Sequence, residues 1–400
     1  MTLSRRPSLR SGRASRGFTL IELLISMTIG LVLIGALGII MARFEQSKNQ
    51  NSTTMDLAQG TGYMAYDLDR QIRSAGSGMF TSKGASFGCP LAAARNGAQI
   101  LPRLTAFPAP FATVPVNLRA IPLIVFPGAG QGGSDLIQVT TFASGTSESP
   151  LQVQPNTVTV NSMTLFNTLG LRAGDLLMMQ EAALNCLIVQ IDPTFAAAPA
   201  TTVLPLAGPR FAAAVGLTNI VAYGRTGAAN VMPIGNANGN QPQIQLIGIN
   251  ASQQLVAYDA LQFNNVPNSD VPVPLAENVM DMRALYGVDN NEDGIVDRWV
   301  APSTAPFDPA TMNNNTTAAQ GAMASIVALR LSLVVRGDRI EKESDPRVAP
   351  TSLTMFSALP GFARTVAIDD QERRRNYRLI ELSIPIRNAI LSAPKRIPPT

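Results

Sequence analysis

One run of residues near the start of the chain constrains its fold more than any other. The 20 residues from Leu23 to Ala42 carry no charge, and such a run can cross a lipid bilayer as a helix. Glu22 stands directly before this run, where a membrane-buried carboxylate costs about 2.5–3.5 kcal/mol unless a positive charge pairs with it. A simple anchor gains nothing from that residue. We therefore expect Glu22 to meet a positive group of another molecule.

The segment before the apolar run indicates its orientation. Residues 1–17 contain five arginines and no acidic residue, so we expect them to stay in the cytoplasm while the following chain is exported. An ordinary secretory signal has its small-residue cleavage site after the apolar core, whereas Gly17 lies before it. Cleavage after Gly17 would keep the helix on the mature chain. It would also create an α-amine on Phe18, with which Glu22 of a neighbouring subunit could pair.

The sequence Arg16-Gly17-Phe18-Thr19-Leu20-Ile21-Glu22 resembles the leader and cleavage motif of type IV prepilins and type II secretion pseudopilins. In that family a prepilin peptidase cuts after the glycine and methylates the new N-terminal phenylalanine, and the glutamate sets register during filament assembly. The resemblance thus implies processing roles for Gly17 and Phe18 and an assembly role for Glu22. The alternatives are a plain N-terminal anchor and twin-arginine export, and the latter leaves both Gly17 and Glu22 unexplained.

Composition limits the classes of function. The chain has 31 basic and 27 acidic residues, and removal of the leader with its five arginines leaves 26 basic residues and a net charge of −1. The mature chain then has no overall positive field to attract nucleic acid. Histidine is absent, which excludes catalytic triads and zinc sites that depend on it. Only 14% of residues are charged, which favours a loop-rich β domain over a helical one.

The remaining pattern predicts an α+β fold, in which a long N-terminal helix packs on a large β-rich periplasmic head. The helix is expected from about Phe18 to Ser74, with a transmembrane half and an amphipathic half that ends before Gly76 and Gly78. We expect a cytoplasmic leader at 1–17, the helix segment at 18–79 with its membrane span at about 18–42, and the head at 80–400. The amphipathic half has apolar residues at helical spacing, namely Leu57, Met64, Leu68, Ile72 and Ala75, and an Asp69–Arg73 pair on the other face.

Strands are expected to dominate the head. The stretch 80–127 is rich in proline and alanine and indicates irregular or edge structure, and 337–376 indicates a charged, loop-rich connection. In the expected strands 327–336 and 379–386, every second residue is apolar, so alternate residues counted from Val327 and from Ile380 should face the core. The expected strands are 135–140, 153–160, 327–336 and 379–386.

Several pieces of the head resemble the PilW family of minor pilins, in an order that spans most of the chain. They are Gly133–Leu136, Ala173–Leu177, Leu275–Val279, Leu285–Asp289, Val327–Leu331 and Ile386–Asn388. The stretches 86–130 and 190–245 match nothing in this pattern and could hold a partner-specific insertion. The resemblance implies a non-enzymatic minor pilin that reaches the pilus from the inner membrane. It also implies other minor and major pilins as partners, through subunit recognition in a priming or tip complex.

Two other functions remain open. One is a large type II secretion pseudopilin, which would share the N-terminal motif. The other is a membrane-tethered periplasmic enzyme that uses carboxylates such as Asp369 and Asp370 for acid–base chemistry. No set of nucleophile and base is visible in the sequence, and adjacent acids would point to opposite sides of a strand.

Cys89 and Cys186 both lie in the segment that is expected in the periplasm. Oxidising compartments favour a disulfide between such a pair. The bond would close a loop of nearly 100 residues and, in the chain-entropy model, stabilise the fold by up to about 4.7 kcal/mol. The alternative is two unrelated buried thiols.

An Asp-rich segment has the spacing of a calcium loop, with side-chain oxygens at alternate positions around a sharp turn at Gly294. The glutamate expected at the twelfth position is missing, because Val300 stands there, so a site would be weak or need another ligand. A hairpin turn of the Asx type explains the pattern equally well. No cofactor other than Ca²⁺ is indicated. The candidate ligands are Asp289, Asn291, Asp293, Asp297 and the carbonyl of Ile295.

Overall fold

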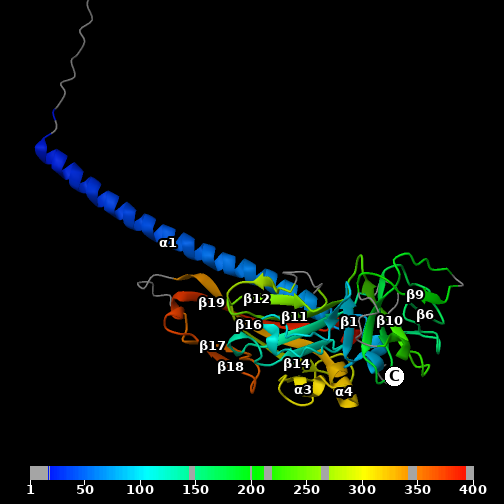
Figure 1. The fold of residues 1–400 in the computed structure, drawn as a ribbon. Coiled ribbons are helices and arrows are strands. Elements are labelled where there is room, and N and C mark those ends of the chain that lie inside the picture. Colours follow the sequence, from blue (N-terminus) through cyan, green and yellow to red (C-terminus); the bar gives the residue numbers. More distant parts are fainter. Residues whose placement is uncertain are drawn as a thin grey trace, which may run out of the picture. The chain divides into compact units, whose positions relative to one another are not determined.

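The computed structural model describes residues 17, 19–143, 149–198, 201–210, 219–262, 270–340 and 349–392. The chain divides into two compact units, Met1–Asp56 and Leu57–Thr400. Helix α1 (Leu20–Arg73) begins in the first unit and ends in the second, and a large β-rich region follows it (Figure 1). An apolar N-terminal helix followed by many strands confirms the predicted α+β class.

The first unit carries the apolar part of α1. The stretch Leu20–Phe44 has a mean hydropathy of 2.6 and is exposed, and it is long and apolar enough to cross a membrane. Ser26 and Thr28 are hydroxyl-bearing residues within it, and their side chains donate to the carbonyls of Leu23 and Ile25. The helix therefore satisfies these polar groups internally, as an apolar environment requires.

In the second unit, the last part of α1 packs one face on the core. Met64, Leu68 and Ile72 recur every four residues and are at most 2% exposed, as the helical spacing predicts. The ion pair between Arg73 and Asp69 (2.6 Å) lies on the outer side, also as expected. Gly76 has a φ of +70° and ends the packed face, where a side chain would collide with the ring of Phe80.

A six-stranded sheet divides two hydrophobic cores. In β7, Leu176 and Met178 belong to the larger core, whereas Leu177 and Met179 belong to the second one. Successive side chains of a strand point to opposite faces, so this near-continuous apolar sequence follows from burial on both sides. The strands in spatial order are β2 (Ala98–Leu101), β1 (Leu91–Arg95), β8 (Cys186–Gln190), β7 (Asp175–Gln180), β10 (Asn230–Asn236) and β5 (Leu151–Gln152).

Two antiparallel sheets pack on the larger core. One has the order β13 (Val273–Ala276), β12 (Leu255–Asp259), β11 (Gln243–Ile249), β4 (Leu136–Thr141) and β3 (Leu123–Phe126). The other has the order β15 (Arg298–Val300), β14 (Val279–Val288), β16 (Ile326–Ile340) and β19 (Arg375–Pro385). As predicted, alternate residues from Val327 to Val335 face this core, and so do Ile380, Leu382 and Ile384.

Smaller elements complete the described part of the head. Two further strand pairs are β6 (Ser162–Thr164) with β9 (Val203–Pro205), and β17 (Ser352–Met355) with β18 (Arg364–Ala367). The α-helices are α2 (Lys83–Ser86), α3 (Pro309–Met312), α4 (Thr317–Ser325) and α5 (Arg387–Ser392). The 3₁₀ turns are η1 (Phe80–Ser82), η2 (Phe111–Thr113), η3 (Gln131–Gly133), η4 (Ile220–Ala222) and η5 (Glu372–Arg374).

The structure differs from the sequence expectation in four places. The stretch 337–376, expected as a loop-rich connection, contains the paired strands β17 and β18 and the turn η5. The stretch 153–160 is not a strand, because a turn at Asn156 (φ +60°) leaves only a bridge between Val153 and Leu165. The stretch 80–127 is more regular than expected, since it contributes β1, β2 and β3. In the expected strand 135–140, the structure begins β4 at Leu136 and buries both of its faces.

Candidate assembly site and Asp-rich loop

Thr19 and Glu22 form a cap at the start of α1. The backbone N–H of Glu22 donates to Oγ1 of Thr19 at 3.4 Å, and this hydroxyl lies 3.4 Å from a carboxylate oxygen of Glu22, to which it donates. The arrangement is a variant of the capping box, in which a threonine and a glutamate three residues later satisfy the free end of a helix. Glu22 thus fixes the helix start and places its negative charge beside the positive end of the helix dipole.

Within the described residues, Glu22 has no cationic partner. Its side chain is exposed at the start of the apolar stretch, so it is available to a positive group of another molecule. Gly17 is also exposed. Phe18 lies outside the described residues. The expected roles of Gly17, Phe18 and Glu22 in processing and assembly stay predictions.

Thr19 is a capping residue that the sequence analysis did not predict. Its signal was present, because Thr19-Leu20-Ile21-Glu22 has the threonine-x-x-glutamate spacing of a capping box ahead of an apolar run. The structure adds a local role for the carboxylate of Glu22.

Cys89 and Cys186 are joined in a disulfide, as predicted, with their Cα atoms 5.8 Å apart. The bond lies beside the parallel pairing of β1 with β8, in which Leu91 stands opposite Cys186. Both cysteines are buried in the larger core. The cross-link therefore ties the entry of β1 to the middle of the six-stranded sheet.

A buried ion cluster joins two sheets. The guanidinium of Arg283 on β14 contacts Asp135, just before β4, at 3.1 Å and Asp281 at 3.0 Å. Asp135 also accepts from the backbone N–H of Ala284 (2.9 Å) and of Gly128 (2.9 Å). Burial raises the pKa of Asp135, while these donors oppose the rise. Removal of Arg283 would leave buried carboxylates without a cationic partner. The cluster therefore holds the start of β4 against β14.

The Asp-rich loop is held by hydrogen bonds within itself. The buried carboxylate of Asp289 accepts from the backbone N–H of Asn291 (3.1 Å), Asp293 (3.3 Å) and Gly294 (2.7 Å). Asp293 accepts in turn from the N–H of Ile295 at 2.8 Å. These contacts are those of Asx turns, the alternative that the sequence left open.

The side chains of the other two candidate ligands also accept backbone hydrogen bonds. Oδ1 of Asn291 accepts from the N–H of Asp293 at 3.1 Å, and Asp297 accepts from the N–H of Asn290 at 2.7 Å. In the described part of the chain, no group of three or more Asp, Glu, His or Cys side chains is arranged to hold a metal ion. The carboxylate oxygens that would bind a cation therefore already accept hydrogen bonds from the backbone of the loop. Calcium binding stays a prediction.

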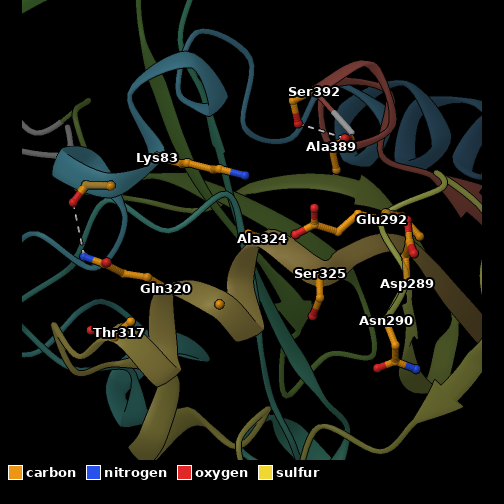
Figure 2. A pocket seen from close by; sticks show the side chains of 13 residues that line it. Lys83, Asp289, Asn290, Glu292, Thr317, Gln320, Ala324, Ser325, Ala389 and Ser392 are labelled. Carbon is orange, nitrogen blue, oxygen red and sulfur yellow. Dashed lines mark hydrogen bonds between the residues drawn. The ribbon is translucent and has the colours of Figure 1, made fainter. Parts of the chain in front are cut away.

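A pocket of about 460 Å³ adjoins this loop. Figure 2 shows Lys83 and Glu292 directed into it from opposite sides, with Ala324 and Ser325 of α4 between them. Asp289 also lines the pocket, but both of its oxygens accept backbone N–H groups. Its carboxylate therefore serves the loop and is poorly placed to act as a base.

Comparison with protein families gives two matches in separate parts of the chain. Residues 12–38 match the prokaryotic N-terminal methylation motif, and residues 246–388 match the type IV pilus-assembly protein W family. No curated protein sequence matches, and no solved structure matches. The first match covers Gly17, the Thr19–Glu22 cap and the beginning of the apolar helix. The second covers β12 through β19, including the Asp-rich loop and Arg283 of the buried ion cluster.

Proposed function

We propose that this chain, a type IV pilin of the PilW family, is a minor pilin that acts in the priming or tip complex of a pilus. It would be made as an inner-membrane prepilin, cut after Gly17 and methylated on Phe18, with its head in the periplasm until it enters the pilus. Its work would be recognition of other pilins, without turnover of a substrate. The family matches support the pilin assignment, and the position in the pilus is our inference.

One combination of features carries this proposal. The methylation motif extends into an exposed, membrane-length helix, in whose first turn Glu22 has no cationic partner among the described residues, and part of the head matches the pilus-assembly family. A helix of this kind gives a subunit both its membrane anchor and a surface for neighbouring helices. The match of residues 246–388 favours a pilus subunit over a large type II secretion pseudopilin.

Mass spectrometry of sheared pili tests the proposal. Pili from cells with the gene should contain this chain in small amount, and its first residue should be N-methylated Phe18. Cells that lack the gene should assemble fewer pili, because a priming complex acts before the filament grows. A chain that begins at Met1, or that never appears in pili while remaining in the membrane, would contradict the proposal.

A further inference from the structure

A small pocket brings two arginines together in the second unit. Arg95 at the end of β1 and Arg210 pair as direct neighbours in an antiparallel bridge. Like charges that face each other across paired strands are destabilising, so this juxtaposition needs a reason. The pocket, which we name the arginine pocket, has a volume of about 270 Å³ and is lined by Arg95, Arg210, Gln241, Pro242, Asp259, Leu261 and Gln262.

The structure holds both arginines in place through neutral groups. Nη1 of Arg95 donates to the carbonyl of Gln262 at 2.8 Å. Nη1 of Arg210 donates to Oε1 of Gln241, and its backbone N–H donates to the side chain of the buried Gln190 at 2.9 Å. These bonds use one guanidinium nitrogen of each arginine, and neither arginine forms an ion pair with the described residues. Both side chains are half-buried and line the pocket, and a guanidinium has further N–H donors beyond those used in these bonds.

The charges of the arginine pocket do not cancel. Asp259 is the one acidic residue among those that line it, which leaves an excess of one positive charge. One oxygen of Asp259, Oδ1, accepts from the backbone N–H of Ile244 (3.2 Å) and of Leu261 (3.0 Å). Burial and the nearby Arg95 both lower the pKa of Arg210, while Asp259 opposes this fall. The flanking segments 211–218 and 263–269 contain no Asp or Glu.

We propose that the arginine pocket binds the carboxylate of an aspartate or glutamate side chain on a partner subunit of the pilus. Two guanidinium forks match the planar, bidentate geometry of a carboxylate. A carboxylate brings one negative charge, which balances the excess, whereas a phosphate dianion would overshoot it and repel Asp259. The volume is below that of ordinary small-molecule sites, about 300–1,000 Å³, and suits a single side chain.

The position of the pocket in the chain supports a partner-specific role. Arg95 and Arg210 both lie outside the two family matches, in the stretches 86–130 and 190–245, whereas Asp259 and Gln262 lie inside the second match. The pocket thus combines residues inside the family match with residues outside it. The inference rests on the proposed function, because it assumes a partner in the pilus.

The test in cells compares full-length variants by their amount in sheared pili relative to the membrane. The double variant R95Q/R210Q should fall by about tenfold or more, since each lost charged hydrogen bond weakens binding by about this factor. R95K/R210K should be intermediate, because it keeps the charge and loses the fork. Arg225→Gln, a matched change at an exposed position, should equal the wild type. All variants should retain the Cys89–Cys186 disulfide and a cooperative melt.

The outcomes separate the two proposals. Wild-type chain that is absent from pili overturns the proposed function, whatever the variants do. Wild-type chain present in pili, with R95Q/R210Q folded and equally abundant, overturns the arginine pocket alone. If R95Q/R210Q does not fold, the single variants Arg95→Gln and Arg210→Gln replace it under the same criterion.

A binding test on the purified full chain in detergent identifies the ligand chemistry. N-acetyl glutamate amide should raise the melting temperature of the wild type, N-acetyl glutamine amide should not, and R95Q/R210Q should show no rise. Asp259→Asn should bind the glutamate probe more tightly, because a competing carboxylate is removed. A larger rise with inorganic phosphate than with the glutamate probe overturns the carboxylate assignment. So does a glutamate shift that survives in R95Q/R210Q.

Discussion

Glu22 combines a local role with a proposed intermolecular one. Its backbone N–H and carboxylate complete the cap with Thr19, and its charge is the group that would pair with the amine of Phe18 in a neighbouring subunit. The two roles depend on different properties of the side chain. A cap needs a hydrogen-bond acceptor, whereas the intermolecular pair needs a full negative charge.

Glu22→Gln should therefore separate the roles. Glutamine can still complete a capping box but carries no charge, so the variant should insert into the membrane normally and be recovered from sheared pili at reduced level. Thr19→Ala is the matched control, since it removes the cap and keeps the charge. Equal recovery of Glu22→Gln and wild type would show that other contacts set the register.

Asp259 makes stability depend on pH. Burial raises the pKa of its carboxyl from 3.8 to about 6, although two backbone N–H groups and the nearby Arg95 and Arg210 oppose the rise. Because the folded pKa lies above the unfolded one, this contribution to stability is fully present below about pH 4. It is lost as the pH rises through about 6, with a magnitude of up to about 3 kcal/mol.

Asp259→Asn should remove this dependence. The amide oxygen can still accept from Ile244 and Leu261, so the variant should unfold at a higher urea concentration than the wild type at pH 8 and at a similar one at pH 4. Asp370→Asn, whose side chain is 88% exposed, is the control and should leave the curve unchanged. A wild type whose stability is flat from pH 4 to pH 8 would contradict the assignment.

At the scale of elements, sequence predicts best where the cause of the structure is local. The spacing of Met64, Leu68 and Ile72 is a property of the helix itself and predicted its buried face correctly. The alternation from Val327 to Val335 did the same for β16. In the helix one face meets one core, so a single period describes it. In β16 the alternation identifies the face on the larger core, although Val334 on the other face is also buried, in a smaller core with Leu285, Met355 and Phe356.

Prediction failed where the cause lies elsewhere in the chain. Strand β1 reads Leu-Ala-Ala-Ala-Arg, which has little strand preference, and it is a strand because β2 and β8 pair with its two edges. Helix α4 consists mostly of small residues, and its buried face is short, with Ala319, Ala322 and Met323. Its clearest local signal is the cap by Thr316. The arginine pocket could not be predicted from the sequence for the same reason, since only the chain topology brings Arg95 and Arg210 together.

The Asp-rich loop offers an element-scale prediction. Asp289→Ala should lower the melting temperature even in chelator, because the backbone N–H groups of three loop residues lose the buried carboxylate that accepts their hydrogen bonds. Calcium binding would appear as a further rise in millimolar calcium over chelator, and Asp293→Ala should abolish that rise. Coincident wild-type melts in calcium and chelator would identify the loop as an Asx turn alone.

At the scale of the whole molecule, the second unit depends on contacts between distant parts of the chain. The six-stranded sheet needs β1 to lie parallel to β8, a pairing of only Leu91 with Cys186 and Ala92 with Leu187. A parallel pair needs a long connection, and here nearly 100 residues separate the partners, so closing this loop has a large entropic cost. The disulfide from Cys89 to Cys186 lowers that cost, because it holds the same ends together in the unfolded chain.

Replacement of both cysteines by alanine should therefore lower the unfolding free energy by about 2–5 kcal/mol. The loss should come mainly through the unfolded chain, so the folded double variant should keep the β-sheet signal in circular dichroism. Wild-type chain treated with reductant is the control, and its urea midpoint should fall to that of the double variant. A midpoint equal to that of the oxidised wild type would show that packing of the two cores alone fixes β1 against β8. In that case burial of Leu91, Ile188 and their neighbours, rather than the cross-link, would carry the stability of the sheet.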